Sequence, residues 1–441
     1  MAAQTPATAA SALGADGTGS IEKPRFVVVG CGAIGGVYGV SLYTAGFPVK
    51  FLVRDSARSM SQRKTLAEKG LELRCVSDPS WGGKIPAEKI PEVFTTDAES
   101  CLKEADYVLV ATKRTQNDQI HNQLKQYGVV CPVVFLQNGR RVVEMLGQTD
   151  YEALECVLNY NTVFDGDEGV VLLTQDWREC SVHLPADKPA STLLAEYMGS
   201  CSKLKTMADP DFIGTQCGKF LVNLTNAVNA LSGEYVSAML LQESYRKVLS
   251  TSYKEAVAVL TAAGIKPKAG RQAGRLACIR ALAREQRQEV AAFGEMMLAS
   301  EPVFKAKFGK VLQSRSKGNT SMAQDLMNGQ VPTEIDFLNG EVSRLGREVG
   351  VPTPVNDKII ELIKKAEVVN KGRPEYTGPE LLKLVGLSLE ENNQQEQLAP
   401  GASAATRGGF GQFGAMASSL ATCALVAACA VAAGRATRSK I

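Results

Sequence analysis

The chain has very little histidine, with only His121 and His183 among its 441 residues. Ser-His-Asp catalysis and histidine-ligated metal sites therefore have almost nothing to work with, and we expect no metal site. The eleven cysteines include no Cys-x-x-Cys pair, which argues against a zinc site or a disulfide framework. This pattern favours buried, reduced thiols in a reducing compartment, either cytoplasmic or cytosol-facing.

Long runs of one charge are also missing. Lys and Arg number 49 against 46 Asp and Glu, which is a formal net charge of +3. Without a basic stripe the chain lacks the electrostatic footprint of a nucleic-acid-binding protein. Hydrophobic residues make up 45% of the 441 residues. That content fits globular packing, and the length exceeds what one hydrophobic core usually supports, so two domains with tails are expected.

Both ends of the chain differ from the middle. Residues 1–24 contain no basic residue before Lys23, unlike a signal or transit peptide, and are interpreted as a flexible tail. Residues 392–413 are polar, glycine-rich and aperiodic, which is typical of a linker. The tail at 414–441 is alanine-rich, and its stretch at 414–434 holds 21 residues without a charge, long enough to span a bilayer. Because alanine adds little insertion energy, a membrane anchor and a surface-docked or disordered helix both remain open.

The first half of the sequence alternates short apolar runs with helical stretches. Such runs are typical of buried parallel strands, and they fall at residues 26–29, 49–53, 107–111 and 132–136. Two later pieces, 156–160 and 169–174, are candidates to extend the same sheet. The pattern predicts an α/β fold with an N-terminal Rossmann-type parallel-sheet domain over residues 25–208.

After Asp209-Pro210 the pattern changes to long amphipathic segments. Their apolar periodicity predicts an all-helical C-terminal domain over residues 209–391, which would carry the substrate and catalytic groups. The expected helices lie at 212–232, 240–264, 283–299 and 334–348.

A glycine motif directly follows the first strand. It reads G-x-G-x-x-G and comprises Gly30, Cys31, Gly32, Ala33, Ile34 and Gly35. Glycines at these positions permit a tight turn and a close approach of a pyrophosphate to a helix N-terminus. Because the motif lies between a predicted strand and a predicted helix, it indicates a dinucleotide site.

Polar residues follow three of the predicted strands. Arg54, Lys113 and Asn138 each come just after an apolar run, and the carboxyl ends of parallel strands meet at one edge of a sheet. An arginine after the second strand can receive the 2′-phosphate of NADP(H), whereas an acidic residue there favours NAD. Since Arg54 precedes Asp55, NADP(H) is the favoured cofactor; the alternative is a solvated Arg54 with Asp55 binding the ribose.

A polar stripe crosses an otherwise apolar helical segment. Lys219, Asn223 and Asn226 are spaced i, i+4 and i+7, which places them on one helical face. A solvated outer face with a snorkelling lysine would give the same pattern. The apolar neighbours leave little room for such a face, so this stripe is a candidate substrate site.

At this point the sequence resembles the ketopantoate reductase (2-dehydropantoate 2-reductase) family, over residues 25–391. Its marks are the glycine loop, Lys113, LQNG, KFLVN, SMAQDLMNGQVPTEIDFLNG and VPTPVND. The resemblance implies NADPH-dependent reduction of ketopantoate to pantoate, the branch that supplies pantothenate and coenzyme A. The expected partner is a small 2-oxo acid.

The resemblance also implies roles for individual residues. Lys219 matches the family's catalytic lysine, a general acid for the carbonyl oxygen, and Glu334 would meet a substrate hydroxyl or pair with Lys219. Lys113 and Asn138 would border the nicotinamide and ribose. Substrate contacts are implied for Asn138, Asn223, Asn226 and Ser321. Glu334 can also be an ordinary first-turn acid behind Thr333 as N-cap.

Three departures from the family pattern keep other functions open. Ala227 stands where a second asparagine is usual, with Asn226 and Asn229 nearby, and residues 159–163 replace a more glycine-containing stretch. Arg140 and Arg141 follow Asn138-Gly139, where apolar or small residues are more common. A reductase of another, more anionic 2-oxo acid is one alternative. A membrane-displayed NADP(H)-binding regulator without turnover is another.

Overall fold

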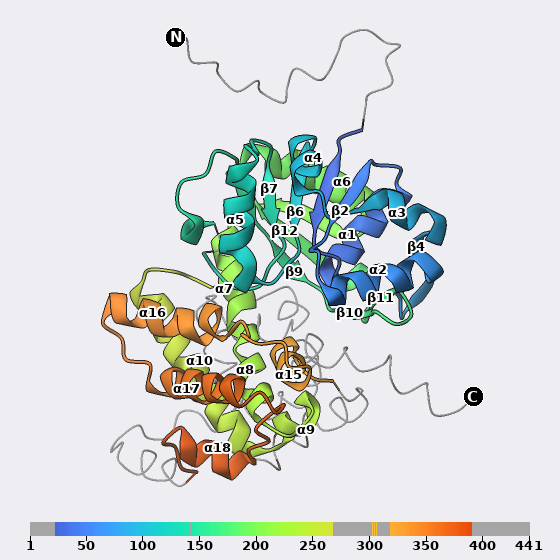
Figure 1. The fold of residues 1–441 in the computed structure, drawn as a ribbon. Coiled ribbons are helices and arrows are strands. Elements are labelled where there is room, and N and C mark those ends of the chain that lie inside the picture. The colour runs from blue at the N-terminus through green and yellow to red at the C-terminus, as the bar shows by residue number, and fades with distance from the viewer. Residues whose placement is uncertain are drawn as a thin grey trace, which may run out of the picture.

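The computed structural model describes residues 23–141, 143–267, 302, 304, 306 and 318–389. Two domains follow one another along the chain, a sheet-containing domain and a helical one, drawn at the top and bottom of Figure 1. The last strand ends at Asp209 and the first long helix of the second domain begins at Phe212. Residues 1–22 of the predicted tail at 1–24, the helix at 283–299, and the linker and tail from 392 onward lie outside the described residues.

The strands all belong to the first domain. Their bounds are β1 Phe26–Val29, β2 Val49–Leu52, β3 Leu71–Cys75, β4 Asp78–Ile85, β5 Phe94–Thr95, β6 Tyr107–Val110, β7 Val133–Phe135, β8 Ala153–Glu155, β9 Val157–Asn159, β10 Thr162–Asp165, β11 Val170–Leu173, β12 Ser181–Pro185 and β13 Lys205–Asp209.

The helices occupy both domains. Their bounds are α1 Ala33–Thr44, α2 Ala57–Lys69, α3 Ile90–Val93, α4 Ala98–Lys103, α5 Asn117–Gln126, α6 Pro189–Ser202, α7 Phe212–Asn223, α8 Thr225–Leu231, α9 Val236–Leu241, α10 Glu243–Ala262, α15 Ser321–Met327, α16 Asn339–Val349, α17 Pro354–Val369 and α18 Gly378–Leu384.

A six-stranded sheet organises the first domain. Its order is β5-β2-β1-β6-β7-β8, and every pair is parallel. β1 and β6 are buried along their whole length, as expected for strands covered on both faces. From β1 the strand order proceeds through β2 to one edge of the sheet and from β6 through β7 to the other. In such folds the ligand crevice lies at the carboxyl ends of the two strands where the order changes, here β1 and β6. The predicted Rossmann-type fold is confirmed.

Helix α1 packs so closely against the sheets that side chains are excluded from one of its faces. A Cβ added at Gly36 would lie 2.4 Å from Val171 of β11, and one at Gly39 would lie 1.9 Å from the ring of Phe51 in β2. The glycines after the nucleotide motif therefore serve packing. They hold the N-terminus of α1 at the sheet edge.

Two smaller sheets complete the first domain. One has the order β10-β11-β3-β4 and the other β13-β12-β9. The apolar pieces at 156–160 and 169–174 form β9 and β11, so the expectation that they extend the main sheet is wrong. The short β8 extends it instead. Local apolar periodicity identifies a strand but does not specify its pairing partners.

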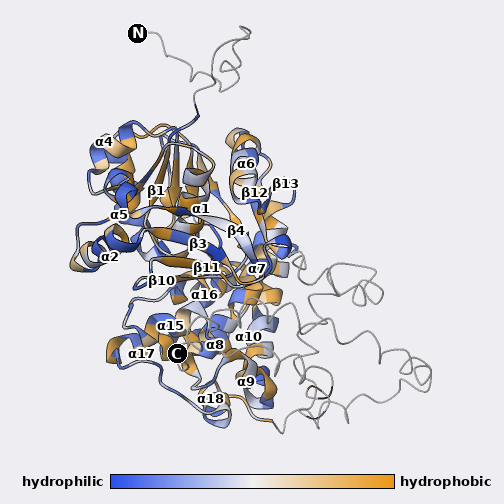
Figure 2. Cartoon of the chain, turned by 90° about the vertical axis from the view of Figure 1, so that its right-hand side faces the viewer, coloured by the Kyte–Doolittle hydropathy of each residue, from blue (hydrophilic) through white to orange (hydrophobic). Residues whose placement is uncertain are grey.

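The second domain is helical in its described part, with a core of apolar side chains from α7, α8, α10 and α15–α18. Figure 2 shows apolar segments facing inward in both domains. The predicted helix at 212–232 is interrupted at Leu224, where α7 passes into α8. The predicted helix at 334–348 begins only at Asn339, after a short 3₁₀ turn at Ile335–Phe337. Among the described residues, no helix is both long and apolar enough to cross a membrane; the candidate anchor at 414–434 lies outside them.

Candidate cofactor and substrate site

The glycines of the loop between β1 and α1 have two different roles: some allow the backbone to turn tightly, and one leaves space for a ligand. Gly30 has φ +95°, a conformation that L side chains rarely adopt, and a Cβ on Gly35 would lie 2.1 Å from the carbonyl oxygen of Gly30. A Cβ on Gly32 would meet nothing within 4 Å. Gly32 is also the N-cap of α1 and offers no side-chain cap for the first N–H groups. Open space and free N–H groups at a helix N-terminus fit a pyrophosphate.

Cys31 lies inside this loop as a neutral thiol. Its side chain is buried, and burial raises the pKa of the thiol to about 12. The backbone carbonyl of Cys31 accepts a hydrogen bond from the amide of Gln62 in α2 at 2.7 Å. The loop is therefore fixed from outside and adds no negative charge beside a phosphate.

A buried amide pair joins the ends of β6 and β7. Gln137 and Asn117 exchange two hydrogen bonds of 2.7 and 2.9 Å, and Gln137 also donates to the carbonyl of Thr112 at 2.8 Å. These bonds hold in place the neighbouring residues Lys113 and Asn138. Sequence reasoning missed this pair; a polar residue directly before Asn138 at the end of an apolar strand was the available signal.

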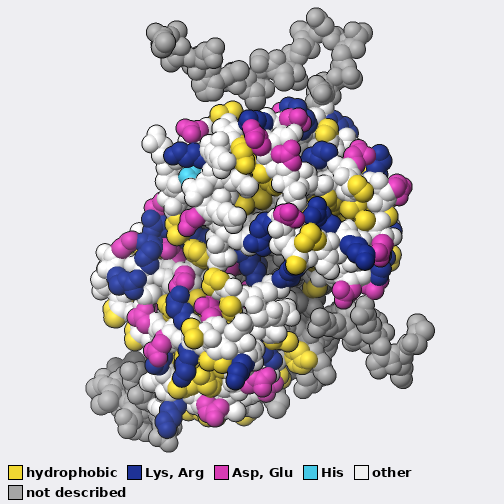
Figure 3. Space-filling view, viewed as in Figure 1, with side chains coloured by type: hydrophobic (Ala, Val, Ile, Leu, Met, Phe, Trp, Pro, Cys, Tyr) yellow, Lys and Arg dark blue, Asp and Glu magenta, His cyan; other side chains and the backbone are white. Residues whose placement is uncertain are grey.

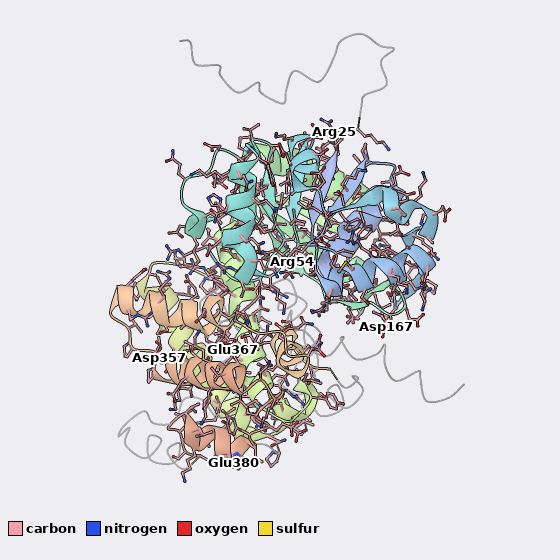
Figure 4. All side chains as sticks on the ribbon, in the orientation of Figure 1. Arg25, Arg54, Asp167, Asp357, Glu367 and Glu380 are labelled. Carbon is pink, nitrogen blue, oxygen red and sulfur yellow. The ribbon has the colours of Figure 1, made fainter. Side chains whose placement is uncertain are left out.

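Arg54 lies at the edge of the first domain that faces the helical domain (Figure 4). It is exposed and forms no hydrogen bond or ion pair with any described residue. The neighbouring Asp55 is turned toward Arg63 of α2, with an Nη2 to Oδ1 distance of 3.8 Å. The Nε of Arg63 is buried without a partner. Positive charge therefore dominates the end of β2, and Arg63 adds to it in a way the sequence pattern did not reveal.

Lys219 lies on α7 in a largely apolar setting. The side chain is half-buried and, within the described part of the chain, its ammonium has no hydrogen-bond or ion-pair partner. Burial lowers its pKa to about 8 from the usual 10.5. Such a lysine is easily deprotonated near neutral pH, which suits proton transfer.

The polar stripe continues with Asn223, one turn after Lys219. Asn223 is buried, and its amide donates to Oδ1 of Asn138 at 3.4 Å. This contact joins the helical domain to the end of β7. The structure thus brings together one predicted substrate residue and one predicted cofactor residue from segments 85 positions apart.

The two asparagines on α8 do different things. Asn229 is fully buried, donating to the carbonyl of Glu234 at 2.9 Å and accepting from the N–H of Thr320 at 2.9 Å. Both polar atoms of its side chain are therefore hydrogen-bonded within the protein, and one of these bonds fixes the start of α15. Asn226 is half-buried, and only its carbonyl is engaged, by the hydroxyl of Thr320 at 3.2 Å. The amide of Asn226 thus stays available for a ligand, whereas Asn229 has a structural role.

Glu334 lies against the first domain. Its Oε1 accepts a hydrogen bond from the N–H of Arg114 at 3.2 Å, and burial raises the pKa of its carboxyl group. No ion pair joins it to Lys219 in the described structure, so the expected pairing is not formed here. Glu334 also precedes the 3₁₀ turn, while Thr333 bonds to Glu367. The alternative of a first-turn acid on α16 is therefore wrong, because that helix starts five residues later.

Lys113 reaches across from the end of β6 to the helical domain. Its ammonium lies 2.5 Å from Oδ1 of Asp325 in α15. Ser321 stands in the first turn of the same helix, exposed and with no hydrogen bond to the described residues. Lys113 of the first domain thus contacts the helix that carries Ser321, one turn away from that residue. Figure 3 shows Lys and Arg side chains gathered around the hollow where the domains meet.

A glycine loop at the carboxyl ends of a parallel sheet is typical of a dinucleotide site, and a desolvated lysine suits proton transfer; together they point to the class of nicotinamide-dependent oxidoreductases. Comparison with protein families agrees with this class. The family model described as ketopantoate reductase PanE/ApbA matches residues 26–166, and the model for its C-terminal part matches residues 211–367. The chain belongs to the ketopantoate reductase family.

Individual relatives are distant. The 2-dehydropantoate 2-reductase of Archaeoglobus fulgidus is 22% identical over 349 residues, which cover 78% of this chain and 98% of that protein. The fold is similar to that of a PanE/ApbA family ketopantoate reductase from Ralstonia eutropha JMP134, with a TM-score of 0.59 and 21% identity over 79% of this chain and 100% of the other. It is equally similar to a D-mandelate dehydrogenase solved with NADH and anilino(oxo)acetate, with a TM-score of 0.58, 21% identity and the same coverage.

Proposed function

We propose that the chain is an NADPH-dependent 2-oxo acid reductase that reduces ketopantoate to pantoate. The observation that carries this proposal is the setting of Lys219. This lysine has no partner among the described residues, and its pKa is lowered to about 8. One turn later on the same helix, Asn223 contacts Asn138, the expected cofactor residue at the end of β7. The family membership and the curated relative named 2-dehydropantoate 2-reductase support the same substrate.

The residues of the glycine loop fit a dinucleotide. Gly32 leaves open space at the N-terminus of α1, and the conformation of Gly30 lets the backbone turn beneath it. When bound, the reduced nicotinamide supplies a hydride to the carbonyl carbon. Lys219 would donate the proton to the carbonyl oxygen and stabilise the negative charge that develops there, a role typically worth about 10² to 10⁴ in rate.

The other residues of the cleft would position the substrate. Asn223 and Asn226 would hydrogen-bond it from the stripe that carries Lys219, and Ser321 would contact its carboxylate from the start of α15. Glu334 would accept a hydrogen bond from a substrate hydroxyl. The half-buried setting of Lys219 and Glu334 indicates that closure around a substrate would exclude most remaining water.

The choice of NADPH rests on Arg54. This arginine is exposed and without a partner in the described chain, while Asp55 is turned toward Arg63. A guanidinium can bind a 2′-phosphate through paired, charge-assisted hydrogen bonds, each contributing about 1.5 to 3 kcal/mol. Asp55 has the opposite charge and would repel that phosphate, but the contact with Arg63 reduces its effect.

One assay tests substrate and cofactor together. The purified chain is mixed with NADPH or NADH and with ketopantoate, pyruvate, 2-oxoisovalerate or phenylglyoxylate, and loss of reduced cofactor is followed. We expect the largest kcat/KM for ketopantoate with NADPH. Arg54→Ala should lower kcat/KM for NADPH about 10- to 100-fold and leave NADH nearly unchanged. Preference for phenylglyoxylate would overturn the substrate, and an unaltered cofactor preference in Arg54→Ala would overturn the role of Arg54.

A further inference from the structure

A pocket lies in the first domain, where Arg140 and Arg141 follow the Asn138–Gly139 turn and where the chain enters α7. Its volume is about 520 Å³, within the range of small-ligand sites. The walls come from the segment after β7, from β8, from the end of β12 and from the residues that lead into α7. None of Lys113, Asn138, Lys219, Asn223 or Glu334 lines it.

Arg140 in the wall of this pocket is a buried cation without a partner. The residue is only 6% exposed, and its Nε and Nη1 are fully buried with no hydrogen-bond acceptor. The structure gives Arg140 no ion pair either, although Arg141 beside it pairs with Glu144. Burying an uncompensated charge is costly. No described residue accepts a hydrogen bond from these two nitrogens, so an anion in the pocket would give the guanidinium a partner.

The carboxylates around the pocket do not fill that role. Glu155 accepts hydrogen bonds from the N–H of Val143 and the amide of Gln216, and Asp211 caps α7 through the N–H of Gly214. Asp209 is bonded to His183 and Thr215, Glu144 pairs with Arg141, and Asp187 is exposed to solvent. These hydrogen bonds hold Glu155, Asp209 and Asp211 against the protein, although their charges remain. Arg140 and Lys188 are therefore the groups of the pocket that can bind an anion.

One further residue adds positive potential. Lys188 lines the pocket, is half-buried and has no partner among the described residues. It immediately precedes α6, and Phe212 and Ile213 in the same wall form the first turn of α7. The helix starts themselves offer an anion little, because α6 begins with Pro189, which has no N–H, and the carboxylate of Asp211 already caps α7.

The remaining wall is apolar, formed by Val143, Ala153, Pro185, Pro210, Phe212 and Ile213. Ile213 is 51% exposed, so part of this apolar wall is open to solvent. We propose that this pocket binds a small organic anion, with its phosphate or carboxylate group on Arg140 and Lys188 and a short hydrocarbon body on the apolar wall. The site is separate from the catalytic cleft, and its occupancy does not depend on the proposed reaction.

The test is isothermal titration of the full chain saturated with NADPH, with hexyl phosphate, hexanoate and hexan-1-ol as probes. The two anions should bind, and the neutral alcohol should bind at least tenfold more weakly. Comparison of the two anions shows which headgroup is preferred. Arg140→Gln should weaken anion binding about 10- to 100-fold, because it removes charge-assisted hydrogen bonds. Arg178→Gln is the matched control, since Arg178 is exposed and lies outside the pocket, and it should change nothing.

Lys188→Ala provides a second test that remains valid if Arg140→Gln fails to fold. It should weaken anion binding about two- to fivefold, as expected for a half-exposed charge, without altering NADPH turnover. Failure of the unaltered chain to bind either anion would overturn the proposal. Equal affinity in Arg140→Gln and the unaltered chain, or competition of the probe with the 2-oxo acid substrate, would do so as well, because the anion would then occupy another site.

Discussion

The two sides of the cleft are built differently. At the glycine loop and between β6 and β7, the Rossmann side is built from backbone and neutral amides: the loop turns at Gly30, and Gln137 and Asn117 bond to one another. On the helical side, ionisable groups are desolvated with few partners. Lys219 has none in the described structure, and Glu334 has a single N–H from the opposite domain.

This difference separates shape from reactivity. The glycine loop and the Gln137–Asn117 pair have the features of a preformed cradle, in which the polar groups are already bonded and little reorganisation is needed to bind a cofactor. The helical side holds groups whose pKa values are shifted by burial, and these are the groups that proton transfer requires. Variants on the two sides should therefore fail in different ways, binding or folding on one side and chemistry on the other.

The largest expected effect is on the helical side. Lys219→Ala should lower kcat for ketopantoate reduction by about 10² to 10⁴ while leaving the Kd for NADPH within about twofold, because a general acid acts mainly in the transition state. Steady-state kinetics and fluorescence titration of NADPH measure the two quantities. Lys358→Ala is the control, because Lys358 is a half-exposed lysine on α17 that pairs with Glu361. A large loss of NADPH affinity in Lys219→Ala would place this lysine on the cofactor instead.

Two glycines of the motif on the Rossmann side, Gly35 and Gly32, have opposite surroundings. A Cβ on Gly35 would lie 2.1 Å from a backbone oxygen, whereas one on Gly32 meets nothing within 4 Å. Gly35→Ala should therefore lower the free energy of unfolding by about 3 kcal/mol, at the upper end of overpacking costs. Gly32→Ala should leave stability nearly unchanged but weaken NADPH binding at least tenfold, because the methyl group would occupy the expected pyrophosphate position. Denaturant unfolding and NADPH titration of both variants give the answer; equal destabilisation by the two would contradict it.

The same contrast explains what the sequence could reveal. The strands at 26–29, 49–53, 107–111 and 132–136 and the glycine loop are local patterns, and the structure confirms the fold they predict. The partners of β9 and β11 could not be read in this way, because pairing depends on contacts between distant segments. Periodicity also failed at Leu224, where a helical sequence is divided into α7 and α8.

The candidate site shows a similar limit. The i, i+4, i+7 spacing identified Lys219 and Asn223, and the structure sets Asn223 against Asn138. The partners of Glu334 and Lys113, which are Arg114 and Asp325, come from segments more than 200 positions away in the chain and left no local signal. The separate use of Asn229 depends on Thr320, another distant contact. The roles assigned to the individual site residues stay predictions.

The pH dependence of kcat/KM tests the role of Lys219 on the helical side. With Lys219 protonated as the acid and its pKa at about 8, kcat/KM for reduction should be level below pH 8 and fall about tenfold per pH unit above it. Unfolding does not explain such a fall. The unfolded chain binds more protons at Lys219 between pH 8 and 10.5, so this group's contribution to stability rises with pH in that window. A flat profile up to pH 9.5 in a stopped-flow assay would remove Lys219 from the role of acid.

The smallest expected effect lies in the contact between the two sides. Asp325 is nearly buried where it meets Lys113, with side-chain exposures of 12% and 33%, whereas the Asp336–Lys364 pair is exposed at 53% and 48%. Asp325→Asn should therefore lower the free energy of unfolding by about 1 kcal/mol, and Asp336→Asn by less than about 0.5 kcal/mol. Urea unfolding of both variants at low and high salt measures the difference, and the exposed pair should lose its small effect at high salt first. Equal effects for the two variants would mean that the contact with Asp325 does not help to position Lys113 at the end of β6.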